Sequence, residues 1–229
     1  FPPSVMGNLS IADLDGDGKV EIAWSYSNRI YLFDNGGNIL TGWPVIVLNY
    51  NDQIMLFSDA LSSGDLNGDG KLEIFAISTD ACMAASGGGF SGVCYSAADA
   101  VLYAFNKDGS VVSGFPKTTS ADGFKGGAYS TANYAPTLAD VDGDGKDEVI
   151  LGVTPVTMFG ESGKKSLNNP PVIYTQVATA DIDGDGKLEF AGGFYGTVNI
   201  FKNDGSVSWS RSVSGNESGS WFSSLPVLA

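Results

Sequence analysis

The sequence predicts an all-β fold made of repeated four-stranded antiparallel units. Three observations support this prediction. A nine-residue acidic motif occurs four times, each copy is followed by a run rich in β-branched and aromatic residues, and glycine turns follow those runs. The chain has 229 residues, of which 43% are hydrophobic and 31 are glycine. This composition supplies enough apolar surface for a packed core and favours many tight turns over long helices.

The acidic motif divides the chain into units. It starts at residues 13, 65, 140 and 181 and reads DLDGDGKVE, DLNGDGKLE, DVDGDGKDE and DIDGDGKLE. The starts are 52, 75 and 41 residues apart, a spacing typical of solenoids, propellers or arrays of repeats. The longest interval requires an insertion, which we place in the stretch that contains Cys82 and Cys94.

Each motif lies between two predicted strands. In the first unit, small and apolar residues at Leu9–Ala12 precede the motif, and a β-branched and aromatic run at Glu21–Trp24 follows it. An aromatic-rich strand at Ile30–Phe33 and an Asn-Gly turn come next, which predict a hairpin. We expect a fourth strand to end at Gly42–Pro44, or at Gly114–Pro116 in the second unit, because proline suits an outer edge.

Four antiparallel strands in each repeating unit are the blade of a β-propeller. We predict one β-propeller region over residues 1–229, with blades at about 4–50, 58–117, 133–170 and 175–215, and the first strand of a further blade at 223–229. We therefore expect the chain to be an excerpt of a larger propeller, or a part that another segment or chain completes. In the third unit the pattern is short, with a strand at Val156–Phe159 and a turn at Gly160–Gly163.

The acidic motif has the donor set of a calcium loop. Positions 1, 3 and 5 are Asp, with one Asn, and position 9 is Glu, while glycines at positions 4 and 6 let the backbone turn tightly. The side chains of positions 1, 3, 5 and 9 and the carbonyl of the lysine at position 7 can converge on one ion. Oxygen ligands suit Ca²⁺ better than Mg²⁺, which resists full dehydration. An EF-hand is excluded because position 12 is Trp24, Ala76, Leu151 or Gly192 and not an acid.

The motif and the following aromatic hairpin resemble the FG-GAP/VCBS repeat family, whose members include the propellers of integrin α subunits. The resemblance extends from about Pro3 to Ala229 and rests on the D-x-[DN]-G-D-G-x-x-E loop, the Y-x-F-x-x-x-G hairpin and the fourfold repetition. It implies about four structural calcium ions, the second held more weakly because Asn67 is neutral. With the lysine carbonyls added, the expected metal-site residues are Asp13, Asp15, Asp17, Lys19, Glu21, Asp65, Asn67, Asp69, Lys71, Glu73, Asp140, Asp142, Asp144, Lys146, Glu148, Asp181, Asp183, Asp185, Lys187 and Glu189.

Charge and composition exclude several classes of function. The net charge is −14, from 26 acids and 12 bases, so nucleic acid and anionic membrane surfaces are unsuitable partners. No run of about 18 apolar residues exists, so we expect no membrane insertion. Histidine is absent, which excludes Ser-His-Asp and Cys-His nucleophiles and histidine metal ligands in this chain.

The expected location is secreted or at the cell surface. Calcium loops of this kind are filled at extracellular calcium concentrations and hardly at cytosolic ones. The chain begins at Phe1 and not at Met, which we interpret as a processed form or an excerpt. Cys82 and Cys94 lie close together in a Gly- and Ser-rich stretch and predict a disulfide bond, with two free thiols as the alternative.

The leading functional hypothesis is a protein- or carbohydrate-binding module of the adhesion or lectin type, without enzymatic activity, whose partner is an extracellular protein or glycan. We expect the binding loops on the face away from calcium, in insertions at 49–59, 80–99, 117–134 and 162–176. The candidate aromatic contacts there are Phe90, Tyr95, Phe124, Tyr129 and Tyr134. Two alternatives remain open: a structural subunit of an extracellular filament or surface layer, and a polysaccharide lyase or glycosidase. The acids available to such an enzyme are Asp52, Asp59, Asp80, Asp99 and Asp122.

Overall fold

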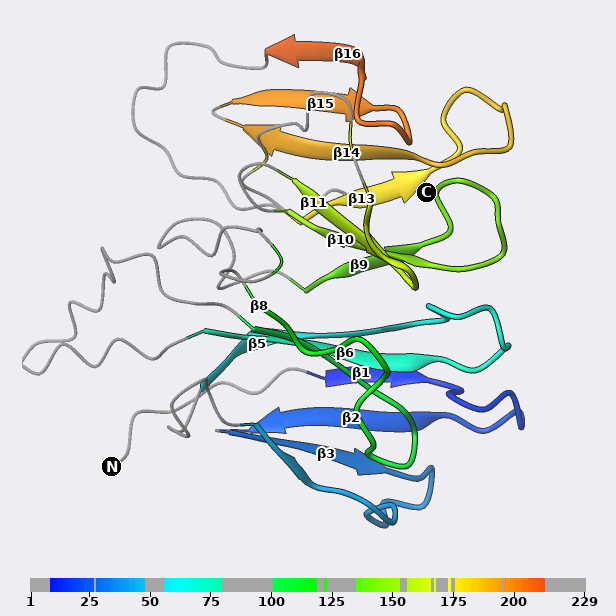
Figure 1. Cartoon of the computed structure of the whole chain (residues 1–229), viewed down its shortest axis with the longest axis vertical. Helices are drawn as coiled ribbons and strands as arrows, with labels where there is room; N and C mark the ends of the chain where they lie inside the picture. Colours follow the sequence, from blue (N-terminus) through cyan, green and yellow to red (C-terminus); the bar gives the residue numbers. More distant parts are fainter. Residues whose placement is uncertain are drawn as a thin grey trace, which may run out of the picture.

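The computed structural model describes residues 9–26, 28–47, 56–79, 101–118, 122, 135–152, 156–165, 167, 173, 176–194 and 196–212. Within these residues, sixteen strands form four sheets of four strands each. In each sheet the strands are antiparallel and neighbours in space follow one another in sequence (Figure 1). The predicted all-β class and its repeated four-stranded units are thus confirmed.

The sheets are called blades 1 to 4 in chain order. Blade 1 consists of β1 (Leu9–Ala12), β2 (Glu21–Tyr26), β3 (Arg29–Phe33) and β4 (Val45–Ile46). Blade 2 consists of β5 (Leu56–Gly64), β6 (Glu73–Thr79), β7 (Val101–Phe105) and β8 (Lys117–Thr118). Blade 3 consists of β9 (Thr137–Ala139), β10 (Glu148–Leu151), β11 (Thr157–Gly160) and β12 (Gly163–Lys165). Blade 4 consists of β13 (Ala178–Ala180), β14 (Glu189–Phe194), β15 (Thr197–Phe201) and β16 (Val207–Ser212).

The fourth strand of the first two blades lies later in the chain than expected. In blade 1 the residues between β3 and Gly42 pair with the sheet only through an isolated bridge, from Ile39 to Phe33. Gly42 has a φ of 93°, and the N–H of Trp43 donates to the carbonyl of Leu40, so the chain turns there. Sheet pairing starts after the proline, where Val45 of β4 pairs with Ile30 of β3. Gly42–Pro44 therefore precedes the fourth strand and does not end it.

Three stretches that we expected to be loops, 49–59, 117–134 and 162–176, are partly strand. The strand β5 begins at Leu56, so part of the stretch 49–59 that we expected to be a loop is strand. The register of its pairing with β6 shifts between Phe57 and Leu61, and no pattern in the sequence predicted this irregularity. In blade 3 the expected third strand is present as β11, and a short fourth strand, β12, follows the turn at Gly160–Gly163.

Neighbouring blades pack face to face through three apolar clusters. Blades 1 and 2 share Leu14, Ala23, Ile30, Leu32, Trp43, Val47, Leu61, Ile74, Ala76 and Phe105. Blades 2 and 3 share Leu66, Phe75, Ile77, Leu102, Ala104, Val149, Leu151 and Phe159. Blades 3 and 4 share Ala139, Val141, Ile150, Val156, Met158, Ile173, Val177, Phe190 and Phe201. Most of the buried apolar residues that the structure describes therefore lie between sheets, as in stacked repeats.

The four acidic motifs occupy equivalent places in the blades. Each joins the first strand of its blade to the second, and the four loops lie at the same end of the sheets, on the right in Figure 1. The β7–β8 hairpin lies at this end too, because Lys107 in its turn contacts Asp15 in the first loop. The described part of the chain forms no helix long and apolar enough to cross a bilayer.

Several expectations concern residues outside those that the structure describes. These are the disulfide between Cys82 and Cys94, the further strand at 223–229, the aromatic contacts Phe90, Tyr95, Phe124, Tyr129 and Tyr134, and the acids Asp52, Asp80 and Asp99. They remain predictions, as do the four blade boundaries.

Close contact between blades 2 and 3 gives a test of this packing. A Cβ added at Gly64 would lie 2.5 Å from Leu138 Cβ and 2.7 Å from a carboxylate oxygen of Asp147. We expect Gly64→Ala to destabilise the fold by about 1 to 3 kcal/mol through overpacking. Thermal unfolding measures this loss, with Ser63→Ala on the same strand as the control. Equal melting temperatures for the two variants would contradict the close packing of these blades.

Candidate metal centres

The first aspartate of each motif organises its loop. The carboxylate of Asp65 accepts hydrogen bonds from the backbone N–H groups of Gly68 (2.7 Å), Asp69 (3.1 Å) and Gly70 (2.8 Å). The aspartates that start the third and fourth motifs accept the same three bonds, and Asp13 accepts two of them. Gly68 and Gly70 have φ angles of 74° and 80°, a region in which glycine is strongly favoured. The backbone of each loop therefore turns around the carboxylate of the aspartate at position 1.

The glutamate at position 9 ties the end of each motif back to its start. Glu21 accepts a hydrogen bond from the N–H of Leu14 at 2.9 Å, through Oε2. The other three motifs repeat this bond at 3.0, 3.1 and 2.8 Å. All four glutamates are buried. One carboxylate oxygen of each thus supports the backbone, and its second oxygen is not used in that bond.

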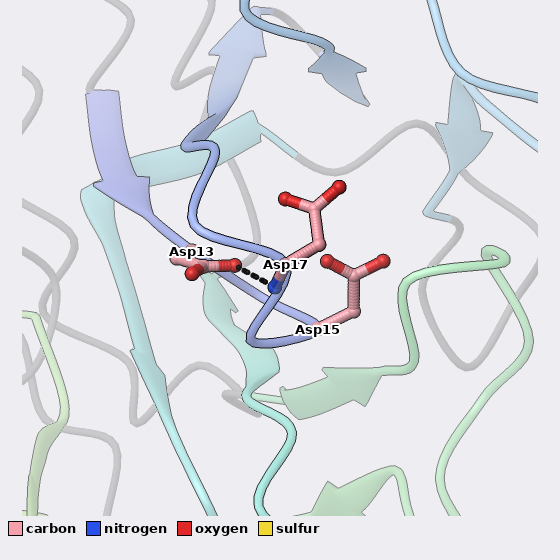
Figure 2. Close-up of side chains that lie close together, drawn as sticks. All are labelled: Asp13, Asp15 and Asp17. Carbon is pink, nitrogen blue, oxygen red and sulfur yellow. Dashed lines mark hydrogen bonds between the residues drawn. The ribbon is translucent and has the colours of Figure 1, made fainter.

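Three of the four loops bring carboxylates together closely enough for one cation. Ligand atoms lie within 4.8 Å of one another in the sets Asp13, Asp15 and Asp17; Asp140, Asp142 and Glu148; and Asp181, Asp183 and Glu189. Figure 2 shows the first set, with Asp13 bonded to the backbone nitrogen of Asp17 and the carboxylates of Asp15 and Asp17 beside each other.

The second loop differs, because its neutral position 3 leaves no comparable set of acids. The amide of Asn67 lies 3.4 Å from Glu73 Oε1, and its oxygen accepts the N–H of Asp69. The lysine at position 7 donates its N–H to the position-5 carboxylate in each loop, at 2.8 to 3.0 Å. Its side chain forms an ion pair in two loops: the exposed Lys19 pairs with Asp17 of its own loop, and Lys146 pairs with Glu161.

Two lysines that the sequence reading missed enter the acidic loops. The Nζ of Lys107 lies 2.6 Å from Asp15 Oδ2 and 2.9 Å from Glu21 Oε1. The Nζ of Lys165 contacts Asp142 Oδ2 at 2.6 Å and also bonds Glu148 Oε1. The hairpins of blades 1 and 4 have asparagine at the position of Lys107. This difference between repeats was the one feature of the sequence that could have pointed to a special role for Lys107.

Consecutive loops are joined to each other by backbone hydrogen bonds. The N–H of Leu72 in the second loop donates to the carbonyl of Leu14 in the first, at 2.9 Å. Asp147 in the third loop donates its N–H to the Asp65 carbonyl at 2.7 Å, and its carboxylate accepts the Asp65 N–H at 2.8 Å. Burial raises the pKa of Asp147, and the nearby Asp65 carboxylate adds to this effect. The first three loops therefore form a continuous edge across three blades.

The residues of these loops are suitable ligands for a calcium ion. Every loop offers only oxygen atoms as metal ligands, and hydrogen bonds from backbone N–H groups to the carboxylates hold the loop in a turn. Like charges this close repel one another unless a cation lies between them. The effect is clearest in the second loop, where burial and the charges of Asp69 and Asp65 raise the pKa of Glu73 to about 7, from 4.5.

The raised pKa gives a test on metal-free protein. The folded state binds a proton at Glu73 more tightly than the unfolded state, so this contribution to stability is complete below pH 4.5 and is lost as the pH rises through about 7. We expect the melting temperature of the metal-free chain to fall between pH 5.5 and pH 8. The fall should be smaller in Glu73→Gln, whose amide stays neutral. Parallel pH profiles of the melting temperature for the two proteins would contradict the raised pKa of Glu73.

The comparisons with known proteins agree with this geometry. Residues 13–76 match the family model described as an FG-GAP-like repeat, which confirms the predicted repeat over the first two loops and the strands between them. No curated protein matches the chain by sequence.

Three solved structures resemble most of the chain. They are the V. cholerae biofilm matrix protein Bap1 (21% identity, TM-score 0.54, covering 90% of this chain and 28% of that one), the Bacillus licheniformis rhamnogalacturonan lyase PL11 (19%, 0.56, 90% and 40%) and the rhamnogalacturonan lyase YesW (20%, 0.54, 89% and 42%). At this identity the likeness concerns the fold, and it confirms the β-propeller class; four open sheets fit part of a propeller. The chain spans less than half the length of each of these proteins.

Proposed function

We propose that the chain is a calcium-stabilised β-propeller segment that acts as an extracellular binding module for a protein or a glycan. The observation that carries this proposal is the repeated acidic loop, whose carboxylates are gathered and held by hydrogen bonds from backbone N–H groups. In this proposal the ions are structural, and the chain is not an enzyme. The fold shared with a biofilm matrix protein supports an extracellular role. The fold shared with two lyases makes enzymatic activity the alternative that an experiment must test.

Calcium acts on this scaffold by relieving repulsion at one edge of the blades. The first three loops are hydrogen-bonded to one another, so an ion in one loop supports its neighbour as well. With a Kd of about 0.1 mM and calcium at about 1 mM, each site adds about 1.4 kcal/mol, or roughly 5 to 6 kcal/mol for four sites. A gain of that size is comparable with the whole stability of many domains.

Removal of metal tests the structural role. We expect excess chelator to lower the melting temperature by roughly 10 to 20 °C, from the stabilisation above and the usual entropy of unfolding. Restored calcium should reverse the change. An unchanged melting temperature in protein shown to be free of metal would contradict the proposal.

A single loop can be tested separately. Glu189→Gln keeps an acceptor for the N–H of Ile182 but removes one carboxylate from the fourth loop. We expect calorimetric titration to show one calcium ion fewer, or that site weakened by tenfold or more. Asp204→Asn, in the exposed turn between β15 and β16, is the control and should bind as the unmodified chain does.

The binding role itself needs a ligand screen. An array of extracellular glycans, probed with calcium-loaded protein and again in chelator, should give signals that depend on calcium. Turnover of rhamnogalacturonan or another polysaccharide, measured as new unsaturated or reducing ends, would favour the enzymatic alternative.

Exposed apolar residues at both ends of the stack favour a second candidate function, assembly. Position 2 of the acidic loop is buried by the following blade at Leu14 and Val141, but Ile182 in blade 4 is 41% exposed. At the other end, Leu9 in blade 1 is 59% exposed, whereas its counterpart Leu61 in blade 2 is buried.

We propose that a second copy contacts blade 1 through the edge of its blade 4 at Ile182. Ala191 and Ile200 on the outward face of blade 4 are already buried, so this contact is smaller than the one between neighbouring blades. Such a head-to-tail contact closes a ring or extends into a filament.

The oligomeric state tests this second candidate. We expect light scattering to show association that increases with protein concentration, and Ile182→Asp or Leu9→Asp to abolish it. Val111→Asp is the control, since Val111 is an exposed apolar residue in the hairpin of blade 2. A chain that stays monomeric at all concentrations would contradict assembly but not the calcium-stabilised scaffold.

A further inference from the structure

The four acidic loops fall into two kinds, and a lysine makes the difference. In the first and third loops a lysine amine bonds the carboxylates at positions 3 and 9, which are two of the groups expected to hold calcium. Among the residues that the structure describes, no lysine or arginine forms an ion pair with the acids of the second and fourth loops.

The position of Lys107 is built into the contact between two blades. This lysine belongs to the β7–β8 hairpin of blade 2, yet its amine lies in the loop of blade 1. The indole N–H of Trp43 in blade 1 donates to the carbonyl of Lys107 at 2.8 Å. Next to it the two backbones touch: a Cβ added at Gly109 would lie 2.6 Å from the carbonyl oxygen of Gly42. The backbone that carries Lys107 is therefore held against blade 1, within reach of Asp15.

Lys165 reaches its loop from within its own blade. It lies on β12, the edge strand of blade 3, and its side chain crosses to the loop between β9 and β10. It packs over β11, because a Cβ added at Gly160 would lie 2.9 Å from Lys165 Cε. The small residue at position 160 thus makes room for the lysine beside the buried Glu148.

An amine and a calcium ion need the same space in these loops. Calcium lies about 2.3 to 2.6 Å from its oxygen ligands. The Nζ of Lys107 lies 2.6 and 2.9 Å from two of those oxygens, so an ion bound through them would touch the amine and repel its charge.

We propose that Lys107 and Lys165 are tethered cations that compete with calcium in the first and third loops. The inference rests on the proposed function, since it assumes that the loops bind calcium. It divides the sites into two classes: the second and fourth loops bind calcium without competition, and the first and third bind it only when the lysine leaves. In the metal-free chain the two lysines neutralise part of the acidic charge. Calcium in the first loop would also break an ion pair that joins blades 1 and 2.

Calorimetric titration of the metal-free chain with calcium tests the competition. We expect two classes of site in the unmodified protein. Lys107→Met and Lys165→Met should each move one weak site to an affinity higher by roughly tenfold, because a hydrogen bond between charged groups no longer has to be broken. Lys202→Met is the matched control: it removes the same charge from an exposed position in the hairpin of blade 4 and should leave all affinities unchanged.

Amine labelling gives a second measurement that needs no variant. Reductive methylation followed by mass spectrometry should label Lys107 and Lys165 slowly in chelator, because their amines are paired with carboxylates. It should label both faster as calcium is added, while Lys202 reacts at one rate throughout. This result keeps the test valid even if a lysine variant fails to fold.

The possible outcomes separate the two proposals. Calcium binding with unchanged affinities in both lysine variants, and labelling rates independent of calcium, would overturn the competition and leave the calcium-stabilised scaffold standing. Absence of calcium binding to any loop would overturn both proposals. Tighter calcium binding at the first and third loops in the double variant, with the other two sites unchanged, would support both.

Discussion

Repulsion among gathered carboxylates is the constraint on which the rest of this structure depends. Each acidic loop turns around its first aspartate and buries its last glutamate, so negative charges are brought together by the same hydrogen bonds that shape the turn. A charge cannot be buried at low cost without a partner. The chain meets this requirement with a lysine in two loops. In the second loop the cost appears as a raised pKa of Glu73. The proposed calcium ions are the partner common to all four.

The loops matter to the fold because the blades depend on one another. Each interface takes its apolar residues from two sheets, and the first three loops are hydrogen-bonded in series at the edge of those sheets. A disturbance in one loop therefore acts on an interface and not on an isolated turn. This is the expected behaviour of stacked repeats, in which stability is shared between a unit and its neighbours.

Much of this arrangement was predictable from local sequence. The four motifs, the strands beside them and the aromatic hairpins follow patterns of a few residues, which is why the repeated four-stranded units and the acidic loops between their first two strands could be predicted. The position of the fourth strand was not, because it depends on how Gly42 and Trp43 turn the chain before pairing begins at Val45. The lysines were missed for a related reason: Lys107 is 86 residues from Glu21 in sequence, and only the packing of two blades brings them together.

The strand β6 shows how strongly packing on both faces fixes the strand register in the central blades. Ile74 and Ala76 pack toward blade 1, and Phe75 and Ile77, which alternate with them, pack toward blade 3. A slip of one residue would exchange these two sets, placing the aromatic ring of Phe75 where the small Ala76 now lies and opening a void on the opposite side. In a one-sided sheet such an error would expose apolar groups to water. Here it would spoil two contacts at once, so the middle of the stack discriminates most strongly against misaligned strands.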